Sequence, residues 1–299
     1  MSTQTQSPAA PARSSAVARH NLSFGGVLRS EWIKLFSLLS TRILLLLTFA
    51  AIIGVGVLTA FVRYNILDSM AASARAQGVE PSSDMLEQSM PPGSGLDLYN
   101  LPNAGLQIGI LIFGALAVLF MASEYATGMI RSTMSAVPRR TPAFVAKAII
   151  LAVVSYVITT VAGAVTFLLS LPMFQGLGVD LSWSTDGVIY SVFTGGLYVA
   201  GVALIGLSLG TLLRNSAGAI TVLVGIFFVI PIAAGFASLI PGDFWKYVPQ
   251  YIPSEAGGRF LAIGEIDAYI DPWQGGLLFL GYVLLFLVPA MIVLKERDV

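Results

Sequence analysis

The chain has 299 residues, of which 56% are hydrophobic and only 11% are charged, and its 16 basic and 16 acidic residues leave no formal net charge. Soluble domains carry about 25% charged residues, so this composition excludes a large soluble domain. The chain contains no cysteine, which excludes disulfide bonds, thiolate catalysis and zinc sites that need cysteine. We expect no metal site, and the single histidine, His20, lies in the amino-terminal tail.

Apolar runs without Asp, Glu, Lys or Arg dominate the sequence. A helix of about 20 residues crosses the roughly 30 Å hydrocarbon core of a bilayer and satisfies its own backbone there. The alternating pattern of a membrane barrel is absent. We therefore predict an all-α integral membrane protein with a single transmembrane domain over residues 23–299. Its six spans cover about residues 43–62, 102–123, 148–172, 187–212, 216–240 and 274–294.

The charges between these spans are sorted by side. Both termini and the gaps after the second and fourth spans hold 12 of the 16 basic residues and 4 of the 16 acidic residues, and the other gaps hold the remaining 4 and 12. Lys and Arg concentrate on the cytoplasmic side of membrane proteins. We expect both termini in the cytoplasm and a multi-pass protein of the cell membrane.

Residues 1–22 are rich in Ser, Ala, Pro and Gln, a composition typical of a disordered tail. From Phe24 to Leu39, apolar residues recur at helical spacing and polar residues take the other face. We interpret this segment as an amphipathic elbow helix on the inner leaflet, with Trp32 at headgroup depth. Its charged residues are Arg29, Glu31 and Lys34, and we expect Arg29, Lys34 and Arg42, which precedes the first span, to meet anionic lipid. The alternative is a simple cytoplasmic extension of the first span.

The two long external gaps differ in character. Residues 63–100 are acidic and rich in Ser, Gly and Pro, which predicts an external loop that could hold a short helix but no domain. Residues 241–272 combine prolines with several aromatic residues. We interpret them as a re-entrant segment that dips into the outer interface as a gate; a plain external loop with an aromatic belt is the alternative. Within the fourth span, Gly206 and Gly210 predict close packing of another helix inside the bundle.

The sequence carries no phosphate-binding loop, no H-E-x-x-H motif and no Ser and His pair within the spans. We therefore expect no enzyme, no cofactor in this chain and no nucleic-acid partner. The six spans also lack ionisable residues, which mark the pathways of ion-coupled carriers. The remaining transport functions are a passive pore and a permease powered from outside the bilayer.

The most specific segment is the cytoplasmic loop over residues 124–147. Glu124 is placed to cap a helix that opens at Tyr125, and Gly128 permits either a bend or the close approach of a partner surface. Met129, Ile130 and Met134 form an apolar face suited to docking into a groove, whereas a loop whose arginines serve topology alone would leave this face unexplained. The residues that we expect to couple to a partner are Glu124, Tyr125, Gly128, Met129, Ile130, Arg131, Met134, Pro138, Arg139 and Arg140.

This loop resembles the signature of the permease subunits of type 2 ABC exporters, in which Glu124, Gly128, Pro138, Arg139, Arg140 and Lys147 match the pattern in order. Ser30–Leu35 is similar to the elbow helix of the actinobacterial members, and the likeness extends over the six spans. The resemblance implies a half-transporter of a bacterial plasma membrane, paired with a second copy or a sister permease. Two copies of a cytoplasmic ABC ATPase would bind ATP and magnesium, and this chain would have no ATP site.

The resemblance also implies that the second and fifth spans line the dimer interface and the substrate path. The residues suggested for that path are Gln107, Phe113, Phe120, Phe227 and Phe228. An apolar path suits export of a hydrophobic or amphiphilic compound, such as a drug in multidrug efflux, a lipid or a peptide. Two alternatives are a stand-alone channel, for which the spans show no polar stripe, and a non-transporting membrane sensor or immunity protein.

Overall fold

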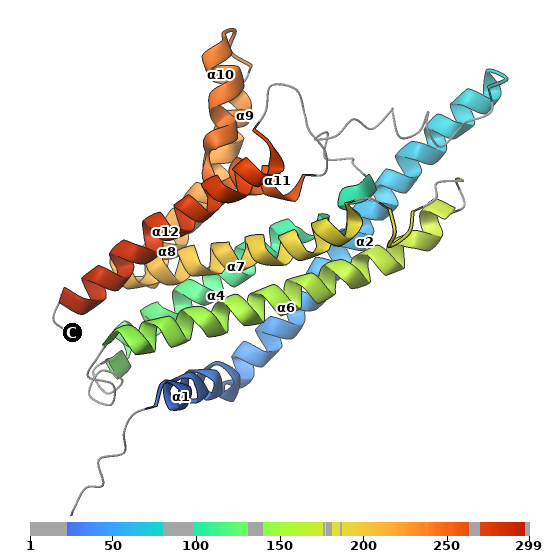
Figure 1. The fold of residues 1–299 in the computed structure, drawn as a ribbon. Coiled ribbons are helices and arrows are strands. Elements are labelled where there is room, and N and C mark those ends of the chain that lie inside the picture. Colours follow the sequence, from blue (N-terminus) through green and yellow to red (C-terminus); the bar gives the residue numbers. More distant parts are fainter. Residues whose placement is uncertain are drawn as a thin grey trace, which may run out of the picture.

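The computed structural model describes residues 23–79, 98–130, 140–175, 177, 181–185, 187–237, 239–262 and 270–296, and every regular element in these residues is helical. This confirms the all-α prediction. In chain order (Figure 1) the elements are α1 Phe24–Ser37, α2 Leu39–Ala76, the 3-10 helix η1 Leu98–Asn103, α4 Leu106–Ala126, α6 Arg140–Gln175, α7 Val188–Leu213, α8 Ser216–Val224, the π-helical η2 Gly225–Val229, α9 Ile230–Ala237, α10 Asp243–Tyr247, the 3-10 helix η3 Val248–Tyr251, α11 Pro253–Leu261 and α12 Pro272–Glu296.

Within the described residues, six helices are long and apolar enough to cross a membrane. They correspond to the six predicted spans, and the fifth is built from α8, η2 and α9 in succession. A chain with six such helices is a multi-pass membrane protein.

Helix α7 lies at the centre of the bundle. Its most apolar stretch is 78% buried, against 28% for α2, 22% for α12 and 17% for the fifth span. A Cβ atom added to Gly206 would lie 2.5 Å from the carbonyl oxygen of Gly114, and one added to Gly210 would lie 2.8 Å from that of Val118. Helices α4 and α7 therefore touch backbone to backbone, as the two glycines predicted.

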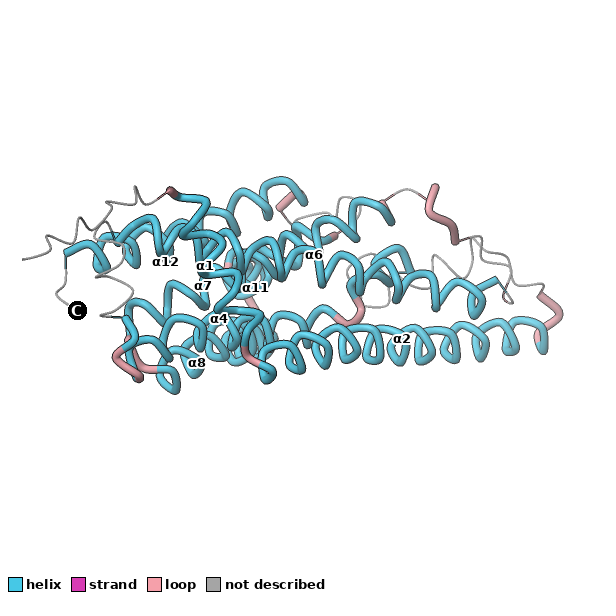
Figure 2. The backbone as a smooth tube through the Cα atoms, turned by 90° about the horizontal axis from the view of Figure 1, so that it is seen from below, coloured by secondary structure: helices cyan, strands magenta, loops and turns pink. Residues whose placement is uncertain are grey.

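Helix α2 continues well beyond the predicted end of the first span at residue 62. Its 38 residues correspond to about 57 Å, which exceeds the roughly 30 Å hydrocarbon core. Beyond Val62 the sequence contains no helix breaker before Gly78, and Leu67 and Ala71 are buried in a second apolar cluster with Phe167 and Phe174 of α6. The first part of the predicted loop 63–100 is thus helical, and residues 80–97 lie outside the described part. Figure 2 shows this end of α2 running past the central helices.

The fifth span is interrupted in its middle. Over Gly225–Val229 the backbone is π-helical, and the Ile230 N–H bonds to the Gly225 carbonyl five residues back. Pro231 has no N–H for the ordinary bond to the residue four positions earlier, which explains why the ladder widens here. Such π-bulges commonly mark functional sites. Beyond the break, α9 diverges from the central helices (Figure 1), and none of its residues is buried.

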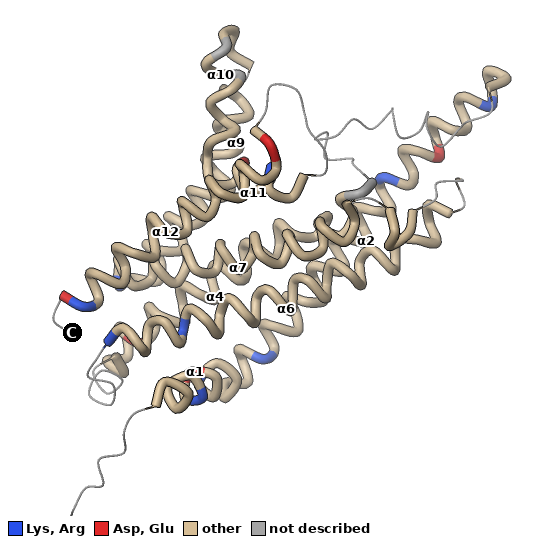
Figure 3. Tube along the Cα trace, viewed as in Figure 1, with Lys and Arg blue, Asp and Glu red and all other residues tan. Residues whose placement is uncertain are grey.

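The bundle has two ends, which we name the α1 end and the α11 end. The α1 end holds α1, the end of α4, the start of α6 and the end of α12; the α11 end holds η1, the start of α7, α11 and the start of α12 (Figure 1). Figure 3 shows the basic residues gathered mainly at the α1 end. Those described there are Arg29, Lys34, Arg42, Arg140, Lys147, Arg214 and Lys295.

Candidate functional site

Four charged side chains form a buried cluster at the α1 end. The Lys147 Nζ atom lies 2.6 Å from Glu31 Oε2 and 2.7 Å from Glu124 Oε1. The Lys34 Nζ atom lies 2.7 Å from Glu31 Oε1 and 3.2 Å from Glu124 Oε1. The side chains of Glu31, Glu124 and Lys147 are 1–3% exposed, and that of Lys34 is 30% exposed. We call these four residues the ion cluster.

Three separate helices supply the ion cluster. On α1, the buried residues Val27, Glu31 and Leu35 follow one another at intervals of four, so that one face of the helix packs on α6 with Glu31 in its middle. Glu124 lies near the end of α4, and Lys147 lies two turns inside α6. The cluster therefore joins the first and last residues of the predicted loop 124–147 directly to each other.

The ion cluster is electrically balanced, with two carboxylates and two ammonium groups. Burial lowers the pKa of Lys34, but its hydrogen bond to Glu31 and the negative charges of Glu124 and Glu31 outweigh this effect, so the pKa is raised. Lys34 is therefore charged at any physiological pH. The Lys147 ammonium also lies 4.4 Å from the centroid of the Phe120 ring, a cation–π contact.

The positions of Glu124 and Lys34 differ from our expectations. Helix α4 continues through Glu124 to Ala126, so Glu124 does not cap a helix that opens at Tyr125. Its carboxylate instead binds the two lysines. The ammonium group of Lys34 turns inward to the carboxylates rather than outward to lipid. Of the other elbow residues, Arg29 is exposed, and Trp32 is 46% exposed with its ring 4.5 Å from that of Phe36.

Helix α4 ends in a turn that directs the chain into the loop. The Thr127 N–H donates to the Ser123 carbonyl at 3.0 Å, and Gly128 has a φ of +71°, a left-handed conformation that favours glycine. The predicted bend at Gly128 is thus present. After it, Met129 is 45% exposed, whereas Ile130 is 3% exposed and packs in the main core. Ile130 therefore anchors the loop instead of offering a docking face.

Two more of the predicted coupling residues, Tyr125 and Arg140, contact residues at the ends of other helices. The guanidinium of Arg214, at the end of α7, lies 5.0 Å from the centroid of the Tyr125 ring. Arg140, at the start of α6, donates to the Leu294 carbonyl of α12 at 3.3 Å. The ends of α7 and α12 are thus tied near the loop. The remaining coupling predictions lie outside the described residues: Arg131, Met134, Pro138 and Arg139.

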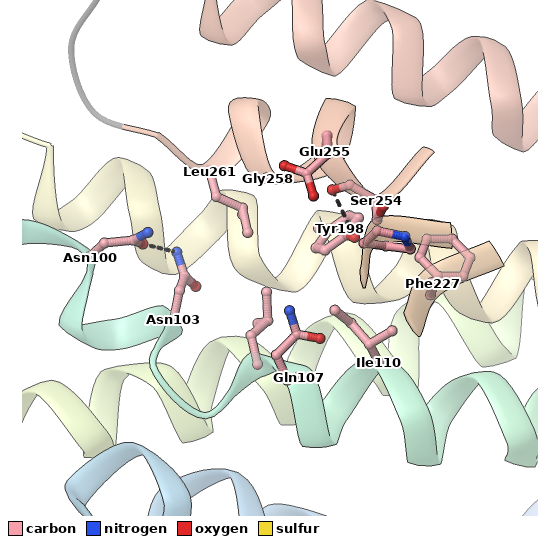
Figure 4. Close-up of a pocket in the computed structure, with 12 residues that line it drawn as sticks. Asn100, Asn103, Gln107, Ile110, Tyr198, Phe227, Ser254, Glu255, Gly258 and Leu261 are labelled. Carbon is pink, nitrogen blue, oxygen red and sulfur yellow. Dashed lines mark hydrogen bonds between the residues drawn. The ribbon is translucent and has the colours of Figure 1, made fainter. Parts of the chain in front are cut away.

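A cavity of about 260 Å³ opens at the α11 end (Figure 4). It lies between η1, α4, α7, the fifth span and α11, and its polar lining consists of amides, hydroxyls and one carboxylate. The residues around it are Asn100, Asn103, Leu106, Gln107, Ile110, Tyr198, Phe227, Pro231, Ser254, Glu255, Gly258 and Leu261. Glu255, on α11, is exposed at the edge of the cavity, and its partial burial there raises the pKa of its carboxyl.

Hydrogen bonds hold α11 and the residues before it over the cavity. The Tyr198 hydroxyl donates to the Ser254 carbonyl at 3.4 Å, and the Tyr190 hydroxyl donates to the Phe260 carbonyl at 3.0 Å. From α12, the Tyr282 hydroxyl donates to the Tyr251 carbonyl at 2.7 Å. The described part of the segment 241–272 folds as α10, η3 and α11, and these bonds fix η3 and α11 to the bundle at this end.

The residues suggested for a substrate path separate in the structure. Gln107 and Phe227 meet at the cavity. Phe113 is 1% exposed inside the core, and Phe228 is half-buried against that core without lining the cavity. Phe120 lies beside Lys147 at the other end. Two of the five residues therefore belong to one cavity, and three do not.

Sequence reasoning gave no site role to Lys147 or Glu255. Lys147 was matched to the family pattern, but its partnership with Glu31 requires the packing of α1 on α6, which no local pattern reveals. Glu255 lies in the segment whose prolines and aromatic residues predicted a re-entrant structure, but four other elements form the rest of the cavity that it lines. In the described part of the chain, no three acidic or histidine side chains gather to hold a metal ion.

The sequence matches no protein-family model, and a comparison with curated proteins finds no similar sequence.

Proposed function

We propose that the protein is the permease subunit of an ATP-driven exporter and couples to a separate cytoplasmic ATPase through residues 124–147. The α1 end then faces the cytoplasm, in agreement with the concentration of Lys and Arg there. The observation that carries the proposal is the ion cluster, because it ties both ends of this loop and α1 into one unit.

A loop that receives force needs a stiff attachment. Buried ion pairs are costly to break, since removing one partner leaves an uncompensated charge in a low dielectric. A displacement of the loop therefore moves α4, α6 and α1 together rather than bending one of them. A solvated loop that serves topology alone requires no such attachment.

Helix α4 can carry this movement across the membrane. From Glu124 in the ion cluster to Gln107 at the cavity it spans 17 residues of continuous helix, about 26 Å. Its backbone contact with α7 at Gly206 and Gly210 links it to the centre of the bundle. In the proposed exporter, ATPase closure at one end changes the cavity at the other, where substrate leaves.

The fifth span supports pairing with a second permease, either an identical copy or a sister subunit. Its outward side chains are strongly exposed and apolar, among them Val229 at 59%, Ile232 at 62% and Phe236 at 70%. A monomer that spans a membrane covers such a surface with lipid or with a partner helix. The resemblance to exporter permeases places the partner here. The exported compound is hydrophobic or amphiphilic, such as a drug, a lipid or a peptide.

The partner ATPase supplies the ATP site and the magnesium ion in this proposal, and this chain supplies the path. The test is affinity purification of the native protein in mild detergent, with mass spectrometry of the co-purifying proteins. We expect an ATPase with a Walker motif to accompany the native chain and to be lost from a Glu124→Arg, Gly128→Trp variant.

Because Glu124→Arg also disrupts the ion cluster, the same purification should include Met129→Arg. Met129 lies on the exposed side of the loop, and we expect its replacement to weaken the complex without unfolding the chain. A chain that purifies without an ATPase, before and after both changes, contradicts the exporter and favours a channel or a membrane sensor.

A further inference from the structure

We propose that the cavity at the α11 end binds an organic cation with a small apolar body, and that Glu255 is its counter-ion. This inference rests on the proposed function in that it names the chemical class of the exported compound. The site itself is defined by the cavity and does not depend on an ATPase.

Among the described residues, Glu255 is the one charged side chain that lines the cavity. In the described part of the chain it forms no ion pair. Arg259 lies one turn further along α11, at the spacing that often pairs with a glutamate, but its Nε atom donates to the Ile270 carbonyl at 2.8 Å. A lone carboxylate among neutral groups gives the cavity a negative potential, which favours a cation over an anion.

The remaining lining suits the rest of such a ligand. Figure 4 shows Glu255 on one side of the cavity and Gln107 on the other, with the Tyr198 and Phe227 side chains beside them. Aromatic rings bind both apolar groups and organic cations. The Ser254 Oγ atom is buried without a hydrogen-bond partner in the described part of the chain, so it is available to a polar group of the ligand.

The size of the cavity restricts the ligand. At about 260 Å³ it lies near the lower limit of ligand pockets, which measure roughly 300–1,000 Å³. It therefore accommodates a small aromatic cation, or the cationic head of a larger amphiphile whose tail extends toward the membrane. The expected ligand is thus restricted from hydrophobic and amphiphilic compounds in general to organic cations of this size.

Protonation of Glu255 should abolish the preference for a cation. Partial burial raises the pKa of this carboxyl above its ordinary value, so the charge is lost as the pH falls through that raised pKa. The other polar groups that line the cavity around Glu255 are neutral: the Tyr198 hydroxyl on α7, the Ser254 hydroxyl on α11, and the amides of Asn100, Asn103 and Gln107 on η1 and α4. No other carboxylate lines the cavity in the described part.

The test measures the binding of phenyltrimethylammonium to the full chain in detergent, with saturation-transfer NMR as the readout. The permanent charge of this probe does not change with pH, so any pH effect reports on the protein. Its uncharged isostere, tert-butylbenzene, separates charge recognition from hydrophobic partition. Asp271→Asn is the matched control variant, since Asp271 also lies at the α11 end but does not line the cavity.

We expect the native chain to bind the cation, and Glu255→Gln to weaken binding about fivefold, the effect of one partly solvated ion pair. Asp271→Asn should leave it unchanged, and the isostere should bind equally to all three chains. Binding to the native chain should also weaken from pH 7.5 to pH 5, a measurement that needs no variant.

The proposal is overturned if the folded native chain does not bind the cation, or if Glu255→Gln and Asp271→Asn bind it equally well. Failure of the exporter proposal looks different: no ATPase co-purifies, while the cation still binds. The cavity would then be the ligand site of a sensor.

Discussion

Lys147 shows how one residue can organise an entire end of the molecule. It contacts a carboxylate from α1 and another from α4, and it lies against the Phe120 ring. The sequence places this lysine at the start of the third span, but a basic residue at the end of a span usually serves only to set the topology. Its burial among carboxylates depends on three helices meeting, which is why the ion cluster could not be predicted from the local pattern.

Replacement of Lys147 by methionine should destabilise the protein strongly. Two buried carboxylates would then share the partly exposed Lys34, and loss of one partner of a buried ion pair costs about 3–5 kcal/mol. We expect a large fall in the thermal unfolding midpoint in detergent. Lys295→Met, at the exposed end of α12, is the control and should unfold as the native chain does. Equal midpoints for the two variants would show that the ion cluster contributes little.

Glu255→Gln should stabilise the protein at neutral pH, in contrast to Lys147→Met. Partial burial raises the pKa of Glu255, so its carboxylate form is slightly disfavoured in the folded state. A group with a raised acidic pKa contributes most to stability below its unfolded pKa, and this contribution is lost as the pH rises through the folded pKa. The variant should therefore unfold at a higher temperature than the native chain at pH 7.5, with the difference shrinking toward pH 4. A lower midpoint at pH 7.5 would contradict this.

At the scale of elements, the apolar runs predicted the six helices because length and hydropathy determine what can cross a bilayer. The extension of α2 to Ala76 was not predicted, because beyond residue 62 its stability comes from packing on α6 rather than from hydropathy. The break at η2 was also missed. Pro231 and Gly225 were its signals, although membrane helices tolerate both residues.

The contact between α4 and α7 predicts opposite outcomes for two glycine substitutions. Gly206→Ala would place a Cβ atom 2.5 Å from the Gly114 carbonyl oxygen and force the helices apart, at a cost of about 1–3 kcal/mol. Gly281→Ala in α12 meets no atom within 4 Å and should be neutral or slightly stabilising, since alanine favours helix by about 1 kcal/mol. Thermal unfolding in detergent measures both. Comparable midpoints would show that α4 and α7 do not pack as described.

At the scale of the whole molecule, the sorted charges predict that the α1 end faces the cytoplasm. Because the chain has no cysteine, single cysteines report this without further changes. Thr127→Cys lies at the α1 end and Ser184→Cys at the α11 end, and both positions are exposed. In intact cells a membrane-impermeant maleimide should label Ser184→Cys and spare Thr127→Cys, which should react after lysis. Labelling of Thr127→Cys in intact cells would reverse the orientation.

The two sites lie at opposite ends of α4, and the proposed exporter would use them together: the loop would receive force, the helix would transmit it, and the cavity would respond. The ion cluster and the cavity are features of the structure, whereas the ATPase is the partner that they are proposed to serve. The exporter proposal therefore depends most on the contact between the loop and that partner.

The most direct test is cross-linking in native membranes from a single cysteine at Met129, which is 45% exposed at the start of the loop, with Ser184→Cys at the opposite end as the control. If the protein is an exporter permease, a bifunctional reagent on Met129→Cys should capture a Walker-motif ATPase, identified by mass spectrometry. The same reagent on Ser184→Cys should capture none. Capture of no ATPase from Met129→Cys, in membranes where the chain is folded and correctly oriented, would contradict the exporter proposal.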